Sequence, residues 1–173
     1  MRLFILGFMG CGKSFSGKRL AKKFDIDFID LDHFLEEKEG NSIREIFETK
    51  GEEYFRNLER ECLQAMKNKS MTVISVGGGT PCFFDNMDWM NNNGITVFLD
   101  TPVSILANRL KKAMSKRPLL KNYTSDGLEK FITEKLSERK AFYEQCQILY
   151  QQKEEGMDVA EDLRKYFHRI VND

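Results

Sequence analysis

The stretch GFMGCGKS, residues 7–14, decides how this chain is expected to fold. It follows an apolar run, residues 3–6, that is typical of a buried strand. It precedes a helical pattern in which Leu20, Ala21 and Phe24 share one face. Strand, glycine-rich loop and helix in this order match the P-loop spacing G-x-x-x-x-G-K-S. The alternative is a glycine turn before an ordinary helix, and we favour a nucleotide site.

The residue types in this loop suit phosphate binding. Gly10, Cys11 and Gly12 are expected to place backbone N–H groups around phosphate oxygens, because the glycines leave no Cβ in the way. The N-terminus of the following helix adds partial positive charge at the same place. Lys13 is expected to reach the β- and γ-phosphates, and the hydroxyl of Ser14 to bind Mg²⁺.

The composition is that of an ordinary globular protein of one domain. The 173 residues are 41% hydrophobic and 31% charged, and 27 basic side chains balance 27 acidic ones. The zero net charge gives no sign of a nucleic-acid surface, which would need a basic excess. Four cysteines form no C-x-x-C pair, and the N-terminal apolar run is too short to span a membrane. We therefore expect a cytoplasmic protein without a membrane partner.

Segments with strand and helix patterns alternate along the whole chain. Ser42 and Glu45 form the pattern of a capping box, at the start of a helix that Gly51 breaks. The alternation predicts one α/β domain over residues 1–173 with a mostly parallel sheet, and ligands beyond the carboxyl ends of its strands. The expected strands are residues 2–6, 28–32, 72–76, 95–99 and 148–150, and the other expected helices are residues 13–24, 32–39, 52–66, 86–90, 102–114, 127–145 and 158–170.

Asp30 and Asp32 stand at the end of the second expected strand, where they should face the P-loop. Phosphoryl transfer to an alcohol needs one carboxylate near Mg²⁺ and another near the hydroxyl that accepts the phosphate. Asp32 also suits the N-cap of the helix that follows it. The residues alone leave both interpretations open.

Arg56 and the glycines at residues 77–79 are candidate substrate contacts. Arg56 suits a bidentate clamp on a substrate carboxylate, or a surface ion pair with Glu52, Glu53 or Glu59. Three glycines at a strand end indicate close approach of the backbone to a ligand, or a tight turn.

Two further arginines follow along the chain. Arg117 lies in a basic stretch and suits a mobile cation that closes over the phosphates, a role that accelerates phosphoryl transfer by roughly 10³–10⁵-fold. A solvated surface loop is the alternative. Arg139 is a third candidate anion ligand, and its alternative is an interaction with Glu138 or with the C-terminus of its own helix.

Together and in this order, these motifs resemble those of the shikimate kinases. Kinases of the gluconate and adenylate type share the P-loop but not the other motifs. The resemblance runs from the N-terminus to about residue 143, and its elements are the P-loop at residues 7–14, D-x-D at 30–32, F-R at 55–56, G-G-G at 77–79, R-P-L-L at 117–120 and R-x-x-x-Y at 139–143.

The resemblance implies ATP-dependent phosphorylation of the 3-hydroxyl of shikimate, with Mg²⁺, in aromatic amino-acid biosynthesis. It implies a five-stranded parallel sheet flanked by helices. A substrate-binding helical region is then expected at about residues 31–66, and a lid at about residues 112–126. Shikimate and ATP are the expected partners, and we expect a monomer.

The resemblance also gives a role to each motif on the phosphate side. Lys13, Asp32 and Arg117 form the catalytic set: the phosphate lysine, the residue that holds the reacting hydroxyl and acts as base, and the lid arginine. Asp30 supports the water shell of the metal bound by Ser14. The expected ATP-binding residues are Gly10, Cys11, Gly12, Lys13, Ser14, Phe15 and Arg117. Phe15 stands where the family usually has threonine or serine near the α-phosphate.

On the substrate side, the resemblance places Arg56 and Arg139 on the carboxylate of the acid. Gly78 and Gly79 then lie near its ring, and Asp32 lies at its reacting hydroxyl. Arg109 is a candidate neighbour of adenine.

Other P-loop classes lack their own motifs here. A GTP-binding switch would need N-K-x-D, which is missing from the sequence. A motor-type ATPase would want a hydrophobic strand that ends in Asp-Glu, whereas residues 95–99 are followed by Asp100 and Thr101. An inactive P-loop scaffold in a binding role and a kinase for another small hydroxylated carboxylic acid stay as alternatives.

Overall fold

The computed structural model describes residues 1–113 and 124–172 of the chain. Its strands are β1 (Arg2–Leu6), β2 (Asp27–Asp30), β3 (Thr72–Ser75), β4 (Ile95–Asp100) and β5 (Ile148–Gln151). Its helices are α1 (Lys13–Phe24), α2 (Leu31–Glu39), α3 (Ile43–Ala65), α4 (Asn86–Asn93), α5 (Val103–Ala113), α6 (Ser125–Tyr143) and α7 (Val159–Asn172), with short 3-10 turns η1 (Met66–Asn68) and η2 (Thr80–Cys82).

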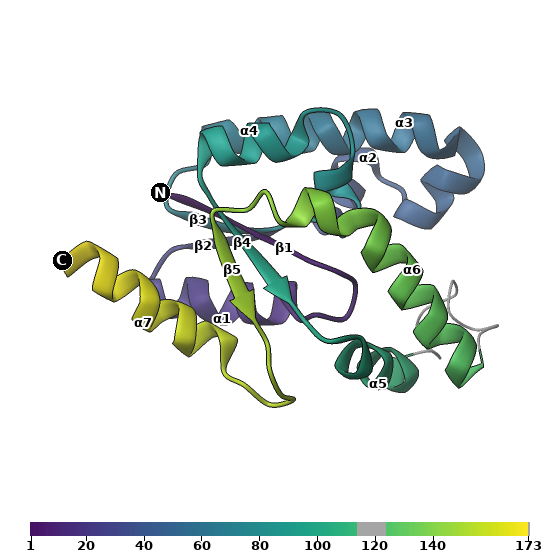
Figure 1. Cartoon of the computed structure of the whole chain (residues 1–173). Coiled ribbons are helices and arrows are strands. Elements are labelled where there is room, and N and C mark those ends of the chain that lie inside the picture. The colour runs from purple at the N-terminus through teal and green to yellow at the C-terminus, as the bar shows by residue number, and fades with distance from the viewer. Residues whose placement is uncertain (114–123, 173) are drawn as a thin grey trace.

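The five strands form one parallel sheet in the order β2-β3-β1-β4-β5. Helices cover both faces, with α2, α3 and α4 on one side and α1 and α7 on the other, while α5 and α6 flank the carboxyl end of β4 (Figure 1). The expected α/β fold with a five-stranded parallel sheet is confirmed. β1 lies in the middle of the sheet, so the P-loop that follows it is central as well.

The apolar run of β1 explains why both faces are covered. Leu3 and Ile5 pack into the core beside α1 and α7, whereas Phe4 and Leu6 pack into the core beside α2, α3 and α4. All four side chains are fully buried. Alternate residues of a strand point to opposite faces, so a central parallel strand must be apolar throughout.

Several local signals act as the sequence predicts. Ser42 accepts from the backbone N–H of Glu45 and completes a capping box at the start of α3. Gly40 closes α2 with φ of 73°, and Gly51 interrupts α3 with φ of 81°. Positive φ is a region that glycine enters without steric cost, so both breaks follow from the residue type.

The second strand ends earlier than the sequence predicted. β2 stops at Asp30, and Asp32 lies in the first turn of α2. The N-cap is Asp30, whose side chain accepts from the backbone N–H groups of Asp32 and His33. Of the two interpretations left open for Asp32, the N-cap is therefore excluded. The side chain of Asp32 is left free to face the P-loop.

The helix expected at residues 86–90 is longer in the structure, because α4 continues through the asparagines at 91–93 and ends before Gly94. The side-chain amide of Asn91 donates to the backbone carbonyl of Gln145, and that of Asn93 donates to the backbone carbonyl of Trp89. These contacts let side chains that usually favour turns stay inside a helix.

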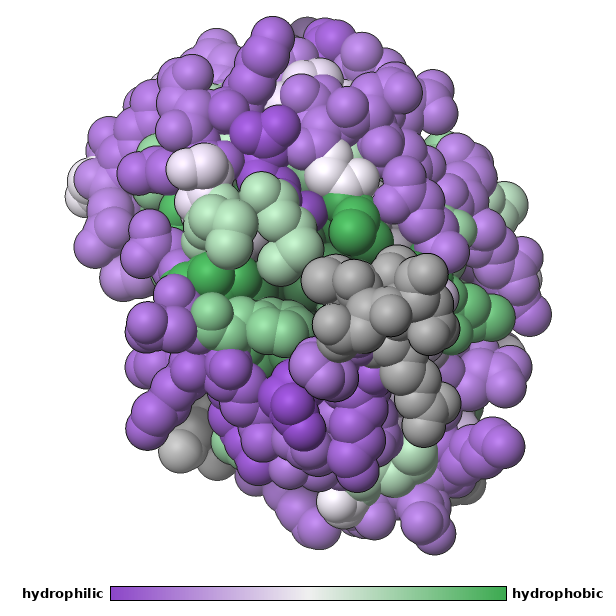
Figure 2. Space-filling view, turned by 90° about the vertical axis from the view of Figure 1, so that its left-hand side faces the viewer, coloured by the Kyte–Doolittle hydropathy of each residue, from purple (hydrophilic) through white to green (hydrophobic). Residues whose placement is uncertain are grey.

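Figure 2 views the molecule from the side at which β1 begins, and it shows a small apolar area within a hydrophilic surface. Met1 and Met71, both about half exposed, belong to this end of the sheet, and the amino group of Met1 donates to Sδ of Met71. The P-loop follows the opposite end of β1, so this area is remote from it. Within residues 1–113 and 124–172, no helix has the length and apolar composition that crossing a bilayer requires.

Candidate active site

A pocket of about 320 Å³ opens where β1, β2 and β3 end. Three predicted motifs border it: the P-loop, the pair Asp30 and Asp32, and the glycine run at residues 77–79. Parallel strands bring their carboxyl ends to one edge of the sheet, so segments far apart in sequence meet there. The lining residues are Met9, Gly10, Gly12, Lys13, Ser14, Phe15, Asp30, Asp32, Ser75, Val76 and Gly78. Met9, Ser75 and Val76 are lining residues that the sequence did not single out.

The P-loop has the backbone shape that phosphate binding requires. Gly10 and Gly12 have φ of 85° and 100°, which a residue with a Cβ rarely adopts. Cys11 between them is buried. The ammonium of Lys13 donates to the carbonyl oxygens of Gly7 at 2.9 Å and Phe8 at 3.2 Å, so it lies over the loop.

Ser14 and Asp30 form a cluster of oxygen atoms at the end of β2. The hydroxyl of Ser14 donates to Oδ2 of Asp30 at 2.5 Å and lies 3.3 Å from the hydroxyl of Ser75. Hydroxyl and carboxylate oxygens are the hard ligands that Mg²⁺ prefers. The described residues hold no group of three or more His, Cys, Asp or Glu side chains suited to a metal ion. A metal here would therefore depend on phosphate oxygens and water for its other ligands.

Asp32 has a carboxyl pKa raised to about 6, above its usual range. Burial is the largest cause, because it disfavours the charged form, and the negative charges of Asp30 and Glu59 add to it. The charge of Lys13 acts in the opposite direction. A carboxylate with a pKa in this range is a suitable proton acceptor near neutral pH.

The glycines at residues 77–79 each meet a different predicted site residue. A Cβ at position 77 would lie 2.8 Å from Oδ1 of Asp32, and one at position 79 would lie 2.9 Å from Nη1 of Arg56. At position 78 it would lie 3.3 Å from Nη1 of Arg139. The segment also turns, since the N–H of Thr80 donates to the carbonyl of residue 77. The segment is therefore a turn, and the lack of side chains at its glycines leaves room for three predicted site residues.

Arg56 is held from two sides. Its guanidinium pairs with Glu59 at 2.9 Å and Glu52 at 3.1 Å, and its carbon Cζ lies 3.9 Å from the centre of the Phe83 ring. The ion pairs match the surface interpretation, but the side chain is only 13% exposed, so this is not a surface arginine. Phe55 and Phe47 lie near the same guanidinium, at 4.9 Å and 6.0 Å. These contacts fix the orientation of the charge.

Glu59 lies in the site, although the sequence analysis considered it only as a possible ion-pair partner of Arg56. It is 1% exposed, pairs with Arg56 and accepts from the hydroxyl of Thr80 at 2.6 Å. Its spacing of three residues from Arg56 was a visible signal, because such residues are neighbours on a helix. The burial of Glu59 on this face of α3 was not predicted.

Arg139 reaches the site from the last turn and a half of α6. Its guanidinium lies 5.6 Å from the centre of the Phe8 ring and beside the backbone of Gly78. Glu138 pairs instead with Lys135 at 2.7 Å, so the predicted alternative partner is engaged elsewhere. Among the described residues, no carboxylate pairs with Arg139.

Tyr143 supports this corner of the site. Its hydroxyl donates to the carbonyl of Gly78 at 2.6 Å, and burial raises its pKa above the usual range. The side chain is fully buried and packs on Phe98. The R-x-x-x-Y motif thus brings one side chain towards the pocket and anchors the glycine run with the other.

Three further predicted residues remain: Phe15, Arg109 and Arg117. Phe15 lines the pocket and is 68% exposed, with the Arg19 guanidinium 5.4 Å from its ring centre. Arg117 and most of the expected lid lie outside the described residues. Arg109 contacts the carbonyl oxygens of Gly10 and Cys11, both at 3.2 Å.

The family model and the similar proteins agree on one family. The family model described as shikimate kinase matches residues 9–171. A shikimate kinase of Phocaeicola vulgatus is 44% identical over 164 residues, which cover 95% of this chain and 91% of the relative.

Solved structures agree with this match. The crystal structure of shikimate kinase from Bacteroides thetaiotaomicron has a TM-score of 0.92 and 38% identity, and the match covers 100% of this chain and 99% of that one. Shikimate kinase from Acinetobacter baumannii, solved in complex with shikimate, has a TM-score of 0.83 and 29% identity, with 98% and 92% of the two chains covered.

Proposed function

The chain belongs to the shikimate kinase family, and we propose that it transfers the γ-phosphoryl group of ATP to the 3-hydroxyl of shikimate. The products are shikimate 3-phosphate and ADP, in the biosynthesis of aromatic amino acids. One observation carries this proposal for the site itself: Arg56, Arg139 and Asp32 converge on three consecutive glycines beside the P-loop. The two arginines can bind the carboxylate of a small acid, the carboxylate of Asp32 can accept from its hydroxyl, and the glycine backbone leaves room for its ring.

Arg56 and Arg139 bind the carboxylate of shikimate. The charge of Arg56 is already shared with Glu52 and Glu59, whereas Arg139 pairs with no carboxylate of the described residues. Arg139 therefore supplies most of the uncompensated positive charge for the anion. Charge-assisted hydrogen bonds of this kind contribute about 1.5–3 kcal/mol each.

Gly78 and Gly79 let the ring of the acid approach the backbone between the two arginines. A Cβ at position 79 would lie 2.9 Å from the guanidinium of Arg56 and would force that side chain to shift, and one at position 78 would make a tight contact of 3.3 Å with the guanidinium of Arg139. The substrate-binding region at about residues 31–66 contains both Asp32 and Arg56. Asp32 lies on α2 and Arg56 on α3. Because these helices hold the two side chains apart, they position the carboxylate and the reacting hydroxyl of the acid separately.

Asp32 orients the 3-hydroxyl of shikimate and accepts its proton during transfer. Its raised pKa makes the carboxylate more basic than an exposed aspartate, while it is still ionised above about pH 6. Lys13 lies close enough to lower that pKa. The proton acceptor and the phosphate lysine are therefore neighbours, as in-line transfer between acid and nucleotide requires.

The nucleotide side uses the P-loop. Backbone N–H groups of residues 10–15 surround the phosphates of ATP, and Lys13 stabilises negative charge on the transferred group. Phe15 contributes its backbone only, since its ring has no hydrogen-bonding group. Arg117 adds a second positive charge from the lid at about residues 112–126, a role that rests on its motif.

Mg²⁺ is the metal that the donor set at Ser14 and Asp30 fits. Ser14 would hold it directly and Asp30 through water. When bound, the ion neutralises charge on the phosphates and orients them for in-line displacement. The hydroxyl of Ser14 is kept in place by Asp30, which is itself fixed as the N-cap of α2.

A cytoplasmic monomer without a nucleic-acid or membrane partner is the remaining part of the proposal. All four cysteines of the chain are free thiols, with Cys11 and Cys62 buried, which fits a reducing compartment. Sedimentation of the purified protein at micromolar concentration tests the monomer.

The first test is release of ADP from MgATP in the presence of shikimate, quinate or gluconate as acceptor. We expect turnover with shikimate and little with gluconate, which has no ring to lie on the glycines. The variant Lys13→Met is the control for contaminating kinases. Turnover with another acid in place of shikimate would keep the kinase and change its substrate, whereas ATP binding without any turnover would favour a binding role.

A further inference from the structure

A chain of polar contacts connects the P-loop with α5 and with the segments after β4 and β5. Nη1 of Arg109 on α5 lies 3.2 Å from the carbonyl oxygens of Gly10 and Cys11, and 3.2 Å from Oε1 of Gln152. The hydroxyl of Thr101 lies 3.1 Å from the same Oε1 and donates to it. The segments after β4 and β5 are thereby linked to the P-loop through one arginine.

Gln152 is unusual in its burial. It is 3% exposed, while the preceding residue, Gln151, is exposed. Its backbone N–H donates to the carbonyl of Asp100 at 2.8 Å, so the base of the side chain is fixed directly after β5. A glutamine is rarely buried unless its polar atoms are bonded, and here the side-chain oxygen has two donors.

The P-loop needs donors on this side for a simple reason. When its backbone N–H groups point at phosphates, some of its carbonyl groups point away and must find other partners. Arg109 supplies an N–H to two of them. The loop also rests on the same helix, because a Cβ at position 10 would lie 3.1 Å from the side chain of Leu110.

Arg109 needs a partner to hold this position, since an arginine side chain has many rotamers of similar energy. Gln152 provides a fixed acceptor from a different element. The segment that carries Gln152 is itself tied to α5, because Asn108 donates to Glu155 at 2.9 Å. The distance between this segment and the P-loop is therefore set at two points of α5.

We propose that Gln152 is a positioning residue for nucleotide binding. Its side-chain oxygen holds Arg109 against the carbonyl oxygens of Gly10 and Cys11, and this keeps the N–H groups of the P-loop aimed at the phosphates. The proposal rests on the ATP-dependent reaction described above. It concerns the nucleotide side of the site alone, because within the described part of the chain the side chain of Gln152 hydrogen-bonds to Thr101 and Arg109 and to none of the residues proposed to face the acid.

The test is the variant Gln152→Leu, which removes the acceptor at similar size. We expect the Kd for ADP, measured by calorimetry, and the KM for ATP to rise about tenfold, because a hydrogen bond to a charged group is lost. The KM for shikimate should stay within about twofold. Gln152→Glu should restore nucleotide binding, since its carboxylate accepts from Arg109. Gln151→Leu is the matched control, one residue away on the exposed side, and should change neither value.

The variant Arg109→Met adds a second measurement. It should weaken ADP binding by itself, and adding Gln152→Leu should weaken it little further, because both changes break the same contact. Unchanged ADP affinity in Gln152→Leu, equal increases in both KM values, or additive effects of the two changes would overturn the proposal. Gln152→Met gives the same comparison if the leucine variant does not fold. ADP binding is measured without an acceptor, so the result holds whichever acid the kinase phosphorylates.

Discussion

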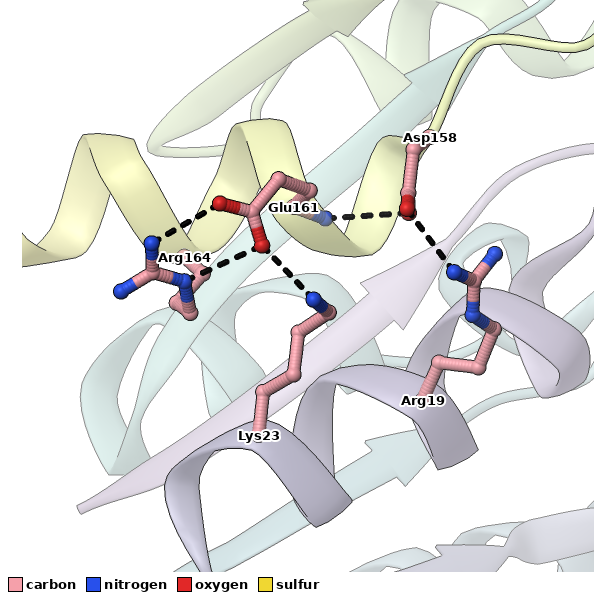
Figure 3. Close-up of polar contacts among 5 residues, drawn as sticks. All are labelled: Arg19, Lys23, Asp158, Glu161 and Arg164. Atoms are coloured by element: carbon pink, nitrogen blue, oxygen red, sulfur yellow. Dashed lines mark hydrogen bonds and ion pairs between the residues drawn. The ribbon is translucent and has the colours of Figure 1, made fainter.

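The charged cluster between α1 and α7 and the charged cluster at the ends of β2 and β3 contain the same kinds of side chain, but water reaches them to different extents. In the first, Arg19 and Lys23 of α1 face Asp158 and Glu161, and Arg164 joins Glu161 (Figure 3). Arg19 and Asp158 are 44% and 41% exposed. In the second, the side chains of Arg56 and Glu59 are only 13% and 2% exposed.

The pKa of one carboxyl in each cluster shows what this difference does. Hydrogen bonds from Arg164 and Lys23 lower the pKa of Glu161 to about 2, because its partners favour the charged form. Burial raises the pKa of Asp32 to about 6, because nearby negative charge and lost water outweigh Lys13. The surface cluster thus stabilises the charge it holds, whereas the site cluster holds the charge of Asp32 at a cost, which suits the proposed role of Asp32 as a proton acceptor.

The largest expected effect is on turnover. Asp32→Asn should lower kcat by roughly 10²–10⁴-fold, because the amide no longer accepts the proton of the hydroxyl. ATP binding should change little. In the wild type, kcat/KM for the acid should fall as pH drops below about 6, where Asp32 is protonated. Steady-state rates from pH 5 to 9 check both points, and near-normal turnover of the variant would remove Asp32 from the handling of the hydroxyl.

The second effect is on binding of the acid. Arg56→Ala should raise the KM for shikimate by roughly 10–100-fold, because charged hydrogen bonds to its carboxylate are lost. The KM for ATP should change much less.

Arg60→Ala is the matched control, one turn further along α3, where the arginine pairs with Asp85 at 2.7 Å and is partly exposed. We expect this variant to keep the KM for shikimate within about twofold. An unchanged KM in Arg56→Ala, with the control behaving the same way, would exclude Arg56 from the acid site.

The third effect is on stability. The change of stability with pH has opposite signs for the carboxyl groups of the two clusters. The folded-state pKa of Asp32, about 6, lies above its reference value of 3.8, so the folded protein binds more protons between these values. The contribution of Asp32 to stability therefore increases as pH falls through 6, and its charged form costs stability above it.

Asp32→Asn should accordingly raise the free energy of unfolding at pH 8 by about 1–2 kcal/mol, and by less at pH 5, since only the charged form is costly. Urea unfolding at the two pH values measures the difference. A variant that is less stable at pH 8 than the wild type would contradict this account of the site cluster.

The smallest effect is expected in the surface cluster. Lys23→Ala should lower the Tm by no more than about 3 °C, and about 1 M NaCl should remove the difference, because exposed ion pairs are screened. Lys22→Ala, at a neighbouring exposed position of α1, is the control.

The contribution of Glu161 has the opposite pH dependence to that of Asp32. Its folded-state pKa lies below its reference value of 4.5, so its stabilisation is present above about pH 4.5 and is lost as pH falls towards 2. If Lys23→Ala lost the same stability at high and low salt, the ion pair of Lys23 with Glu161 would be more than a screened surface contact.

Several elements of the fold could be predicted from the sequence. The apolar run before the P-loop, the capping box at Ser42 and the break at Gly51 each depend on residues close together in the chain, and all three are confirmed. The alternation of strands and helices predicted the parallel sheet for the same reason. Local preferences and periodicity are sufficient where a structure is fixed by its neighbours in sequence.

The end of β2 was predicted less well. A strand and the first turn of a helix are both compatible with the pattern of residues 28–32. The pairing of Asp30 with Ser75 on β3 fixes where the strand stops, and the cap formed by Asp30 fixes where the helix begins. The first of these is a contact between residues far apart in sequence.

By itself, the sequence determined the fold class, the P-loop and the residue types of an acid-binding kinase site. Only the tertiary structure decided that Arg56 is buried against Glu59 and Phe83, that Arg139 faces the glycines and not Glu138, and that Gln152 is buried beneath the P-loop. Burial and charge compensation depend on which elements pack together. The pKa of Asp32 follows from that packing, since the same aspartate in water would titrate near 3.8.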